Sequence, residues 1–436
     1  MMTYLTTGDT GYDEARSVWN AMVDRRPAAI ARCASTEDVV AAVQYGRLNG
    51  LEIAVRCGGH NIAGLAVPEG GLMIDLTPMH EVRVDPSLRR AWVQGGALLG
   101  ELDRAAQEYG LATTAGNVSH TGVGGLTLGG GMGWLARRFG LACDNVISYE
   151  VVTADGSVVR ASADENPDLF WGLRGGGGNF GIVTMFEFQL HHIGTRALSV
   201  EFTYPMAKGF EVLRRWRDLN ANAPREATFT AGLTKDDRGG GVGKESSTVT
   251  VGYVWVGEGG YDLLPAFREL GPIEESVEET TYLKLQSRDD NVQGHRYRRY
   301  WKGHYFKSLP DEAIRALLQV PDVGVSLQAY GGAIADVPDD DAAFSHRDTQ
   351  FEFVTATRWE DPAEDEDRIG ALRAYAATLE PYAHGAYVNT LNDDPINRAF
   401  PPAKLARLVA LKTVYDPENV FHLNQNIRPR RGMMVV

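Results

Sequence analysis

The chain has few cysteines, no long apolar run and no excess of basic residues, and each absence excludes a class of protein. Its three cysteines, Cys33, Cys57 and Cys143, are odd in number and widely spaced, so we expect neither a disulfide framework nor a zinc site. His191 and His192 are neighbours on an expected strand and point to opposite faces, so they do not share a metal. We therefore predict no metal site.

The charge and the hydropathy pattern exclude some classes of binding partner and indicate a cellular location. No window approaches about 18 consecutive apolar residues, which excludes a membrane-spanning helix. The net charge of −14 argues against nucleic acid or an anionic membrane as partner. Met1–Asp9 has neither the basic nor the apolar region of a secretory signal, so we expect a cytoplasmic protein.

The length and the residue pattern predict two domains of the α+β class. A chain of 436 residues is long for one hydrophobic core. Up to about residue 190, short strands and helices surround glycine-rich loops. From about residue 193, two-residue alternation predicts an antiparallel sheet with helices on one face. The strands expected in this second region are 199–204, 248–256, 280–285, 323–330 and 350–355, the helices are 207–219, 311–318 and 363–379, and the acidic stretch 336–341 is expected to be a loop.

The most informative segment is Arg56-Cys57-Gly58-Gly59-His60-Asn61, which follows an expected strand at 51–55. Gly58 and Gly59 allow positive φ and a close approach of backbone to a ligand. Their amides can converge on phosphate oxygens, with Arg56 as a counter-charge. This geometry leaves His60 projecting toward whatever the phosphates carry.

Two further glycine segments, 122–134 and 174–181, extend the same pattern. Together the three loops indicate one large dinucleotide lying along the backbone. Gly176, Gly178 and Gly181 satisfy the Rossmann fingerprint literally, but they follow an expected helix and precede an expected strand. That order is the reverse of the one the nicotinamide fold requires, so we do not predict a Rossmann site.

These loops, together with the ending 387–427, resemble the berberine-bridge-enzyme-like FAD oxidases of the vanillyl-alcohol-oxidase flavoprotein superfamily. The motifs RCGGHN, GVGGLTLGGGMGWL, FWGLRGGGGNFGIVT and YVN…YDPENVFHLNQNI occur in the family's order. The resemblance extends from about Ala28 to Ile427 and is closest to bacterial members similar to 6-hydroxynicotine oxidase.

The resemblance implies a two-domain PCMH-type FAD-binding fold in which an antiparallel sheet covers the flavin. Residues 1–193 would bind FAD, 194–395 would bind substrate, and 396–436 would return to the FAD domain. Trp134 and Phe180 are expected to pack in the core, and 175–178 to contact the cofactor less than the other glycines. The expected cofactor-binding residues are Arg56, Cys57, Gly58, Gly59, His60, Asn61, Gly116, Thr121, Gly122, Gly124, Gly125, Thr127, Gly130, Gly181, Ile182, Val183, Asn424 and Asn426.

The resemblance also implies a covalent bond from the His60 ring to the 8α-methyl of FAD. The alternative for His60 is a histidine that only hydrogen-bonds within its turn. Many relatives add a second link, from a cysteine to C6 of the flavin, but the matching position here is Val118. Cys143 lies downstream and is expected to be a buried thiol, so we predict a single 8α-histidyl attachment and no 6-S-cysteinyl link.

The candidate catalytic residues are Tyr387, Asn389 and Tyr330. The stretch 386–391 is predicted to be a strand entering the cleft, with Tyr387 and Asn389 on one face. The family motif continues with an aromatic residue where this chain has Thr390. Tyr387 is therefore either a proton acceptor or a hydrogen-bonding group beside the flavin.

A tyrosine base needs its pKa lowered toward neutrality. The cationic run at 295–305 is a candidate source of the required charge, although such a run is more often a solvated face. Tyr330, with Gln328, shares one face of another expected strand and is a candidate for the pocket wall.

The activity implied is hydride transfer from a C–H bond of a small alcohol, sugar or cyclic amine to flavin N5. Dioxygen would then reoxidise the flavin and form hydrogen peroxide. Two alternatives stay open: an FAD-dependent dehydrogenase with another acceptor, and a flavin-containing protein that sequesters a ligand. The expected partners are a small-molecule substrate and dioxygen, and the expected assembly is a monomer or homodimer.

Overall fold

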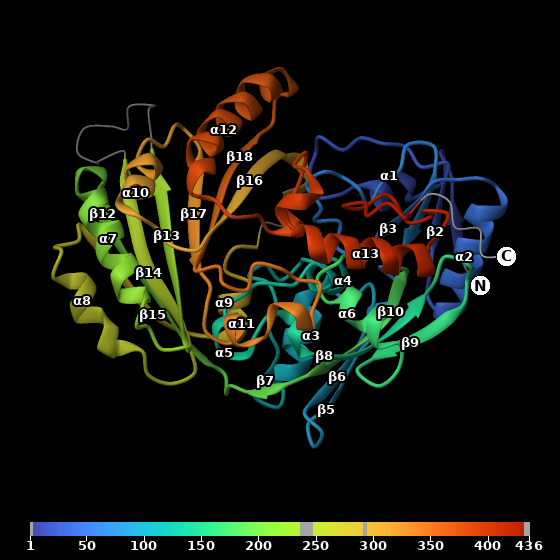
Figure 1. The fold of residues 1–436 in the computed structure, drawn as a ribbon, viewed down its shortest axis with the longest axis horizontal. Helices are drawn as coiled ribbons and strands as arrows, with labels where there is room; N and C mark the ends of the chain where they lie inside the picture. Colours follow the sequence, from blue (N-terminus) through green and yellow to red (C-terminus); the bar gives the residue numbers. More distant parts are fainter. Residues whose placement is uncertain (1–2, 236–246, 291–293, 431–436) are drawn as a thin grey trace.

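A computed structural model describes residues 3–235, 247–290 and 294–430, and its fold is α+β as expected (Figure 1). Residues before position 190 build two sheets. The first has the order β1-β2-β4-β3, with parallel pairing of β4 to both β2 and β3. Its strands are β1 (Thr3–Leu5), β2 (Ala29–Arg32), β3 (Ile53–Arg56) and β4 (Leu72–Asp75).

The second sheet is antiparallel, in the order β5-β6-β10-β8-β9. It contains the hairpin that Asp155-Gly156 predicts between β8 and β9. Its strands are β5 (Val82–Asp85), β6 (Arg90–Gln94), β8 (Val146–Val152), β9 (Val158–Ser162) and β10 (Ile182–Gln189).

Several helices pack against these two sheets. Ser35 caps the first of the longer ones, since its Oγ accepts a hydrogen bond from the Asp38 amide at 3.3 Å. The glycine segment at 122 runs into a short buried helix. The helices are α2 (Thr36–Leu48), α3 (Leu99–Gln107), α4 (Val123–Leu128) and α6 (Pro167–Leu173).

Seven antiparallel strands form the largest sheet, in the order β15-β12-β14-β13-β17-β18-β16. Helices α7, α10 and α12 lie beside this sheet (Figure 1), and their apolar side chains pack against it in a single core that includes Trp216 of α7 and Tyr375 of α12. The strands are β12 (Arg196–Pro205), β13 (Ala227–Thr234), β14 (Thr248–Val256), β15 (Glu274–Thr281), β16 (Arg298–Phe306), β17 (Gly324–Ala329) and β18 (Phe351–Trp359), and the helices are α7 (Gly209–Asn220), α10 (Asp311–Leu317) and α12 (Asp365–Leu379).

Several elements differ from the expectation. The strand expected at 280–285 is wrong: Thr281 ends β15 and its side chain accepts a hydrogen bond from the Lys284 amide, which caps the helix α9 (Tyr282–Gln286). The stretch 336–341, expected to be a loop, contains the end of α11 (Ala333–Asp336) and a 3-10 turn. Sequence reasoning did not identify β1, β5, β13 or β16, and the strand expected at 280–285 overlaps only the last two residues of β15. The domain boundaries at 193 and 395 stay predictions.

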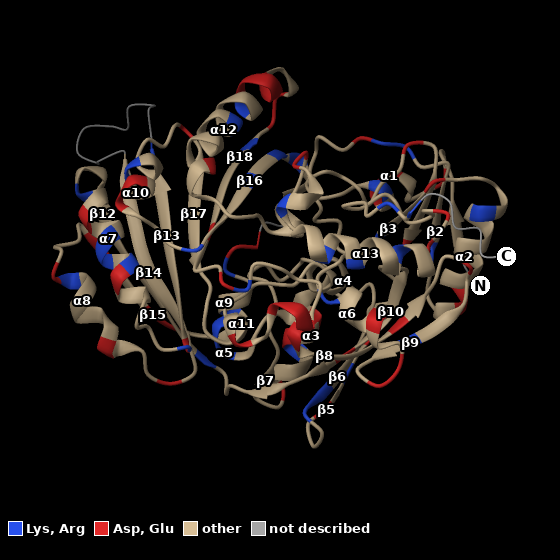
Figure 2. Cartoon of the chain, in the orientation of Figure 1, with Lys and Arg blue, Asp and Glu red and all other residues tan. Residues whose placement is uncertain are grey.

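Charge is distributed over both halves of the molecule. Figure 2 shows acidic and basic residues interspersed along the helices and strands, with an acidic group at the start of α12. Within the described ranges, none of the helices combines the length and apolarity needed to cross a membrane.

The C-terminal helix α13 (Pro402–Tyr415) lies beside α6, far from it in sequence (Figure 1). Lys412 of α13 and Asp416 just after it form an ion pair at 2.6 Å, with both side chains fully buried. Lys412 Nζ also donates to the carbonyls of Asn179 at 2.7 Å and Phe421 at 2.8 Å. The pair therefore fastens the C-terminal segment to the loop that contains Asn179.

Lys412→Met should lower the free energy of unfolding by about 3–5 kcal/mol, because it leaves the Asp416 carboxylate buried without its cation. Urea denaturation measures this change. Arg407→Met is the control: it breaks the exposed pair between Arg407 and Asp168 on the same helix and should cost less than about 1 kcal/mol. Equal effects of the two substitutions would contradict the prediction.

Candidate functional site

A cavity of about 440 Å³ lies where the glycine loops meet the C-terminal segment. This size is within the range of small-molecule and cofactor sites. Its wall is drawn from segments that are far apart in the sequence, namely residues within 53–66, 118–128, 177–183, 387–390 and 421–425, together with Trp19, Leu76, Gly95 and Trp301.

The structure brings most of the residues predicted from the sequence to this cavity. Those that line it are Cys57, Gly58, Gly59, His60, Asn61, Thr121, Gly122, Gly124, Gly125, Gly181, Ile182, Val183, Asn424, Tyr387 and Asn389. The predicted residues that it does not bring to the wall are Arg56, Gly116, Thr127, Gly130, Asn426 and Tyr330.

Packing explains several of these exceptions. Arg56 is directed toward the buried Asp75, with Nη1 at 3.6 Å from Oδ1, rather than toward the cavity. A Cβ on Gly130 would meet the Phe344 ring at 2.6 Å, so this glycine serves close packing. Gly116 accepts a hydrogen bond from Gln286 Nε2 through its carbonyl.

Sequence reasoning missed part of the wall. Trp19 and Trp301 lie outside any motif, so no local signal identified them. Phe421 and Gln425 belong to the C-terminal motif, which was a usable signal for them. Gly177 and Gly178 line the cavity although the sequence argument ranked them below the other glycines.

Two glycine loops approach each other so closely that side chains are excluded. A Cβ on Gly58 would lie 2.3 Å from the Gly122 amide nitrogen, and Gly59 has φ of +68°. By contrast, a Cβ on Gly125 or Gly178 would meet nothing within 4 Å. These last two glycines line the cavity, so a side chain there would occupy the space of a ligand.

His60 lies in an apolar, aromatic environment. Its ring stacks on Trp19 with centroids 4.7 Å apart, and its Nε2 is 2.7 Å from His120 Nδ1. Its Nδ1 is 3.4 Å from Thr121 Oγ1. Burial, reinforced by nearby His120 and cationic Arg299, lowers the pKa of His60 to about 3, so the ring is neutral at physiological pH.

Arg299 covers the other side of Trp19, with its guanidinium carbon 3.7 Å from the ring centroid. The run 295–305 is solvated only in part: His295 and Arg296 are exposed, but residues 298–306 form β16, Arg299 is buried, and Trp301 reaches the cavity. Arg299 instead donates to the carbonyls of Trp19 and Gly294. Its charge sits at the His60 end of the site.

Tyr387 is held by two hydrogen-bond donors. Its Oη accepts from the Gly131 amide at 2.8 Å and from Asn389 Nδ2 at 2.9 Å. The prediction of a strand here is wrong, because Val388–Thr390 is a 3-10 turn, and this turn brings Asn389 back toward the Tyr387 hydroxyl. Burial nevertheless raises the pKa of Tyr387 above its ordinary value of 10.0, so the phenol stays protonated.

Tyr330 lies behind the cavity wall. It is fully buried and donates to Glu352 Oε2 at 2.7 Å. Burial raises the pKa of Glu352 to about 7. Because Tyr330 does not line the cavity, the structure gives no support to its predicted direct role in catalysis.

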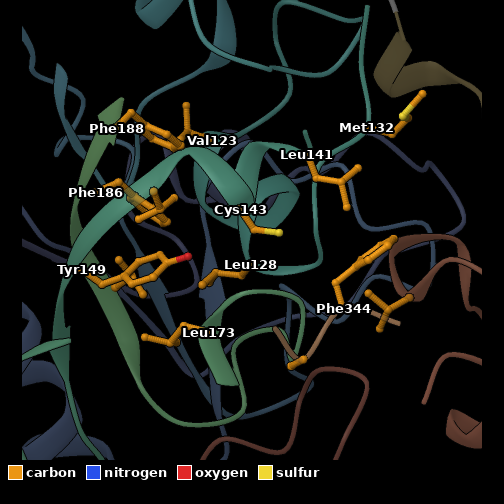
Figure 3. Packing of buried hydrophobic residues seen from close by; sticks show 14 of the residues in the cluster. Val123, Leu128, Met132, Leu141, Cys143, Tyr149, Leu173, Phe186, Phe188 and Phe344 are labelled. Carbon is orange, nitrogen blue, oxygen red and sulfur yellow. The ribbon is translucent and has the colours of Figure 1, made fainter. Parts of the chain in front are cut away.

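Cys143 is a buried thiol in the apolar core. Figure 3 shows it among Leu128, Leu141, Tyr149 and Leu173. Burial raises its pKa, which suppresses thiolate chemistry. None of the three cysteines, all of them in described segments, forms a disulfide. No cluster of three or more His, Cys, Asp or Glu side chains in the described ranges is placed to hold a metal ion.

The cavity wall offers unpaired polar groups to a cofactor. Asn424 Oδ1 and Gln425 Nε2 are buried, line the wall and have no hydrogen-bond partner within the protein. Leaving such groups unpaired costs about 1–3 kcal/mol each. The orphaned acceptor and donor, with the open faces of Gly125 and Gly178, provide the wall that a bound dinucleotide would complete.

Comparison with known proteins identifies the dinucleotide that this family of proteins binds. The chain matches a family model described as FAD binding domain over residues 27–162 and one described as berberine and berberine like over residues 386–428. With relatives that are 30% and 31% identical over 98% and 97% of its length, the chain belongs to the berberine-bridge-enzyme-like FAD-linked oxidoreductases. This oxidoreductase is therefore an FAD enzyme, as the sequence resemblance implied.

Relatives of the enzyme cover nearly its whole length. The (R)-6-hydroxynicotine oxidase of Paenarthrobacter nicotinovorans is 31% identical, over 97% of this chain and 95% of its own. The glucooligosaccharide oxidase of Sarocladium strictum is 31% identical, over 96% of this chain and 91% of its own. The crystal structure of 6-hydroxy-D-nicotine oxidase from Arthrobacter nicotinovorans superposes with a TM-score of 0.87 at 27% identity, covering 98% of each chain.

Gly125→Leu should yield enzyme with little bound flavin, because the new side chain would project from α4 into the cavity. The ratio of flavin to protein absorbance of the purified protein measures the loss. Gly370→Leu is the matched control, since Gly370 is also helical with open space around its Cβ, but it lies on the exposed side of α12. Normal flavin content in Gly125→Leu would show that this face of α4 does not meet the cofactor.

Proposed function

We propose that this enzyme oxidises an uncharged small alcohol or sugar, with hydride passing from a substrate C–H bond to FAD and electrons then passing to dioxygen to form hydrogen peroxide. The names of two relatives, a hydroxynicotine oxidase and a glucooligosaccharide oxidase, support an oxidase acting on a small molecule. The chemistry of the cavity wall selects among the substrates.

The observation that carries this choice is the lack of charged side chains in the wall, including the part beside Tyr387 and Asn389 where the substrate would lie. Among the described residues that line the cavity there is no Asp, Glu, Lys or Arg. A cyclic amine is cationic near neutral pH, and burying its charge without a carboxylate partner costs several kcal/mol. A neutral hydroxyl needs only the hydrogen bonds that the Tyr387 and Asn389 side chains can offer.

We propose that the glycine loops and His60 hold the cofactor. The amides of Gly58 and Gly59 would receive the diphosphate, and the neutral ring of His60 would carry the single covalent link. Val118 lines the cavity at the position where relatives place a second, cysteine link, and its side chain cannot form one. When bound, FAD supplies the hydride acceptor of the reaction.

Tyr387 would orient the substrate rather than act as the base. Both acceptor positions of its Oη are occupied by the Gly131 amide and Asn389 Nδ2, so its own O–H remains to be donated. Because the pKa of this phenol is raised, the donor is present at physiological pH. The O–H group would bind the oxygen of the substrate and fix the C–H bond for transfer.

Tyr387→Phe should lower kcat/KM by roughly 10- to 100-fold, the cost of one hydrogen bond to the reacting substrate. The control is Tyr375→Phe, which removes a buried hydroxyl that donates to the Leu317 carbonyl in the core of the seven-stranded sheet, away from the cavity.

The pH profile separates donor from base. A phenol whose pKa lies above 10.0 keeps its proton at lower pH, so donation by Tyr387 should persist without gain from pH 7 to about 10. A tenfold rise in kcat/KM per pH unit that disappears in Tyr387→Phe would show instead that the phenolate acts as a base.

A screen for peroxide release tests the function as a whole. With neutral secondary alcohols and sugars, the enzyme should form hydrogen peroxide in air, and its flavin should bleach under anaerobic conditions. Cyclic amines should cause neither change. Turnover confined to amines would contradict the choice of substrate. Bleaching without peroxide in air would indicate a dehydrogenase, and tight binding without bleaching would indicate a sequestering protein.

A further inference from the structure

The two rings that meet beside the cavity are both histidines. His60 Nε2 and His120 Nδ1 are 2.7 Å apart, and the ring centroids are 4.6 Å apart. Burial lowers the pKa of both rings, so both are neutral near pH 7 and one of them donates a proton to the other. The direction of that hydrogen bond determines which nitrogen of His60 carries a lone pair.

Only one direction leaves His60 able to form a bond. If His120 donates to His60 Nε2, then His60 Nδ1 carries the proton and neither nitrogen has an available lone pair. If His60 Nε2 donates to His120, the lone pair of His60 lies on Nδ1, whose neighbour Thr121 Oγ1 is distant at 3.4 Å. The second arrangement presents Nδ1 as a nucleophile.

We propose that His120 is the proton acceptor for covalent attachment of the flavin to His60, and that the attachment atom is Nδ1. This inference rests on the covalent link in the proposed function. The Nδ1 lone pair forms the new bond to the 8α carbon, and one C–H bond of that methyl group breaks with loss of a proton. The Nε2 proton of His60 passes to His120 Nδ1. The two electrons of the broken C–H bond reduce the flavin ring and pass, with two protons, to dioxygen, which becomes hydrogen peroxide.

The segment that carries His120 is held in place by Asp290, a residue far from it in the sequence. Asp290, which follows α9, accepts hydrogen bonds from the Ser119 amide at 2.8 Å and the Ser119 hydroxyl at 2.6 Å. Its negative charge partly offsets burial and the nearby cations, which together lower the pKa of His120. The segment that carries His120 therefore has both a fixed position and a negative charge beside it.

The test follows attachment itself rather than turnover. Full-length protein from riboflavin-limited cells is incubated with excess FAD in air, and the flavin that stays on acid-precipitated protein is measured over time. Flavin released by the acid reports non-covalent binding. The variants are His120→Ala and His120→Gln, and the matched control is His295→Gln, because His295 bonds the Val18 carbonyl and has no bond to His60.

We expect His120→Ala and His120→Gln to bind FAD but to attach it about 10²-fold more slowly, the usual effect of losing a positioned proton acceptor. Glutamine preserves an acceptor for the Nε2–H group but cannot take its proton. Added imidazole should accelerate His120→Ala, His295→Gln should match the wild type, and NMR of the wild-type flavopeptide should place the bond on Nδ1.

Each other outcome overturns a defined claim. Attachment by both His120 variants within twofold of the wild-type rate, or a bond on Nε2, overturns the role of His120 and leaves the covalent link standing. Failure of both variants to bind FAD at all would mean that His120 serves binding rather than proton transfer. Wild-type protein that releases all its flavin in acid overturns the link itself, and the role of His120 with it.

Discussion

The close contact between the backbones of two glycine loops is the constraint on which the site depends. Gly58 and Gly122 touch so closely that neither tolerates a Cβ. Because the loops are fixed to each other, the residues that follow them are fixed as well: His60 on one side, Thr121 and α4 on the other. The cavity is thus set by main-chain packing, which side-chain substitution elsewhere does not easily disturb.

Burial without charge gives the site its chemical character. The same desolvation that keeps His60 neutral keeps Tyr387 protonated and raises the pKa of Glu352 behind it. The guanidinium of Arg299 lies over the ring of Trp19, and Arg299 does not line the cavity. The pocket therefore offers hydrogen bonds and aromatic surface, and it leaves redox chemistry to the cofactor.

The sequence predicted the parts of this structure that local patterns determine. Glycine doublets that allow positive φ and close approach, the Ser35 cap and the Asp155-Gly156 hairpin all have short-range causes, and the structure contains each of them. Trp19 and Trp301 reach the cavity through long-range contacts, which a single sequence does not show: the Trp19 amide donates to the Gly59 carbonyl, and Trp301 lies on β16, which pairs with β18. The edge strand β15 is almost wholly exposed and rich in glutamate, so it lacked the alternation that identifies a strand.

The fastening of the C-terminal segment by Lys412 and Asp416 bears on how the protein matures. The wall of the cavity combines Trp19 near one end of the chain with Phe421 and Gln425 near the other. Chains fold from the N-terminus as the ribosome releases them. The cavity therefore stays incomplete until residues 421–425 have been synthesised.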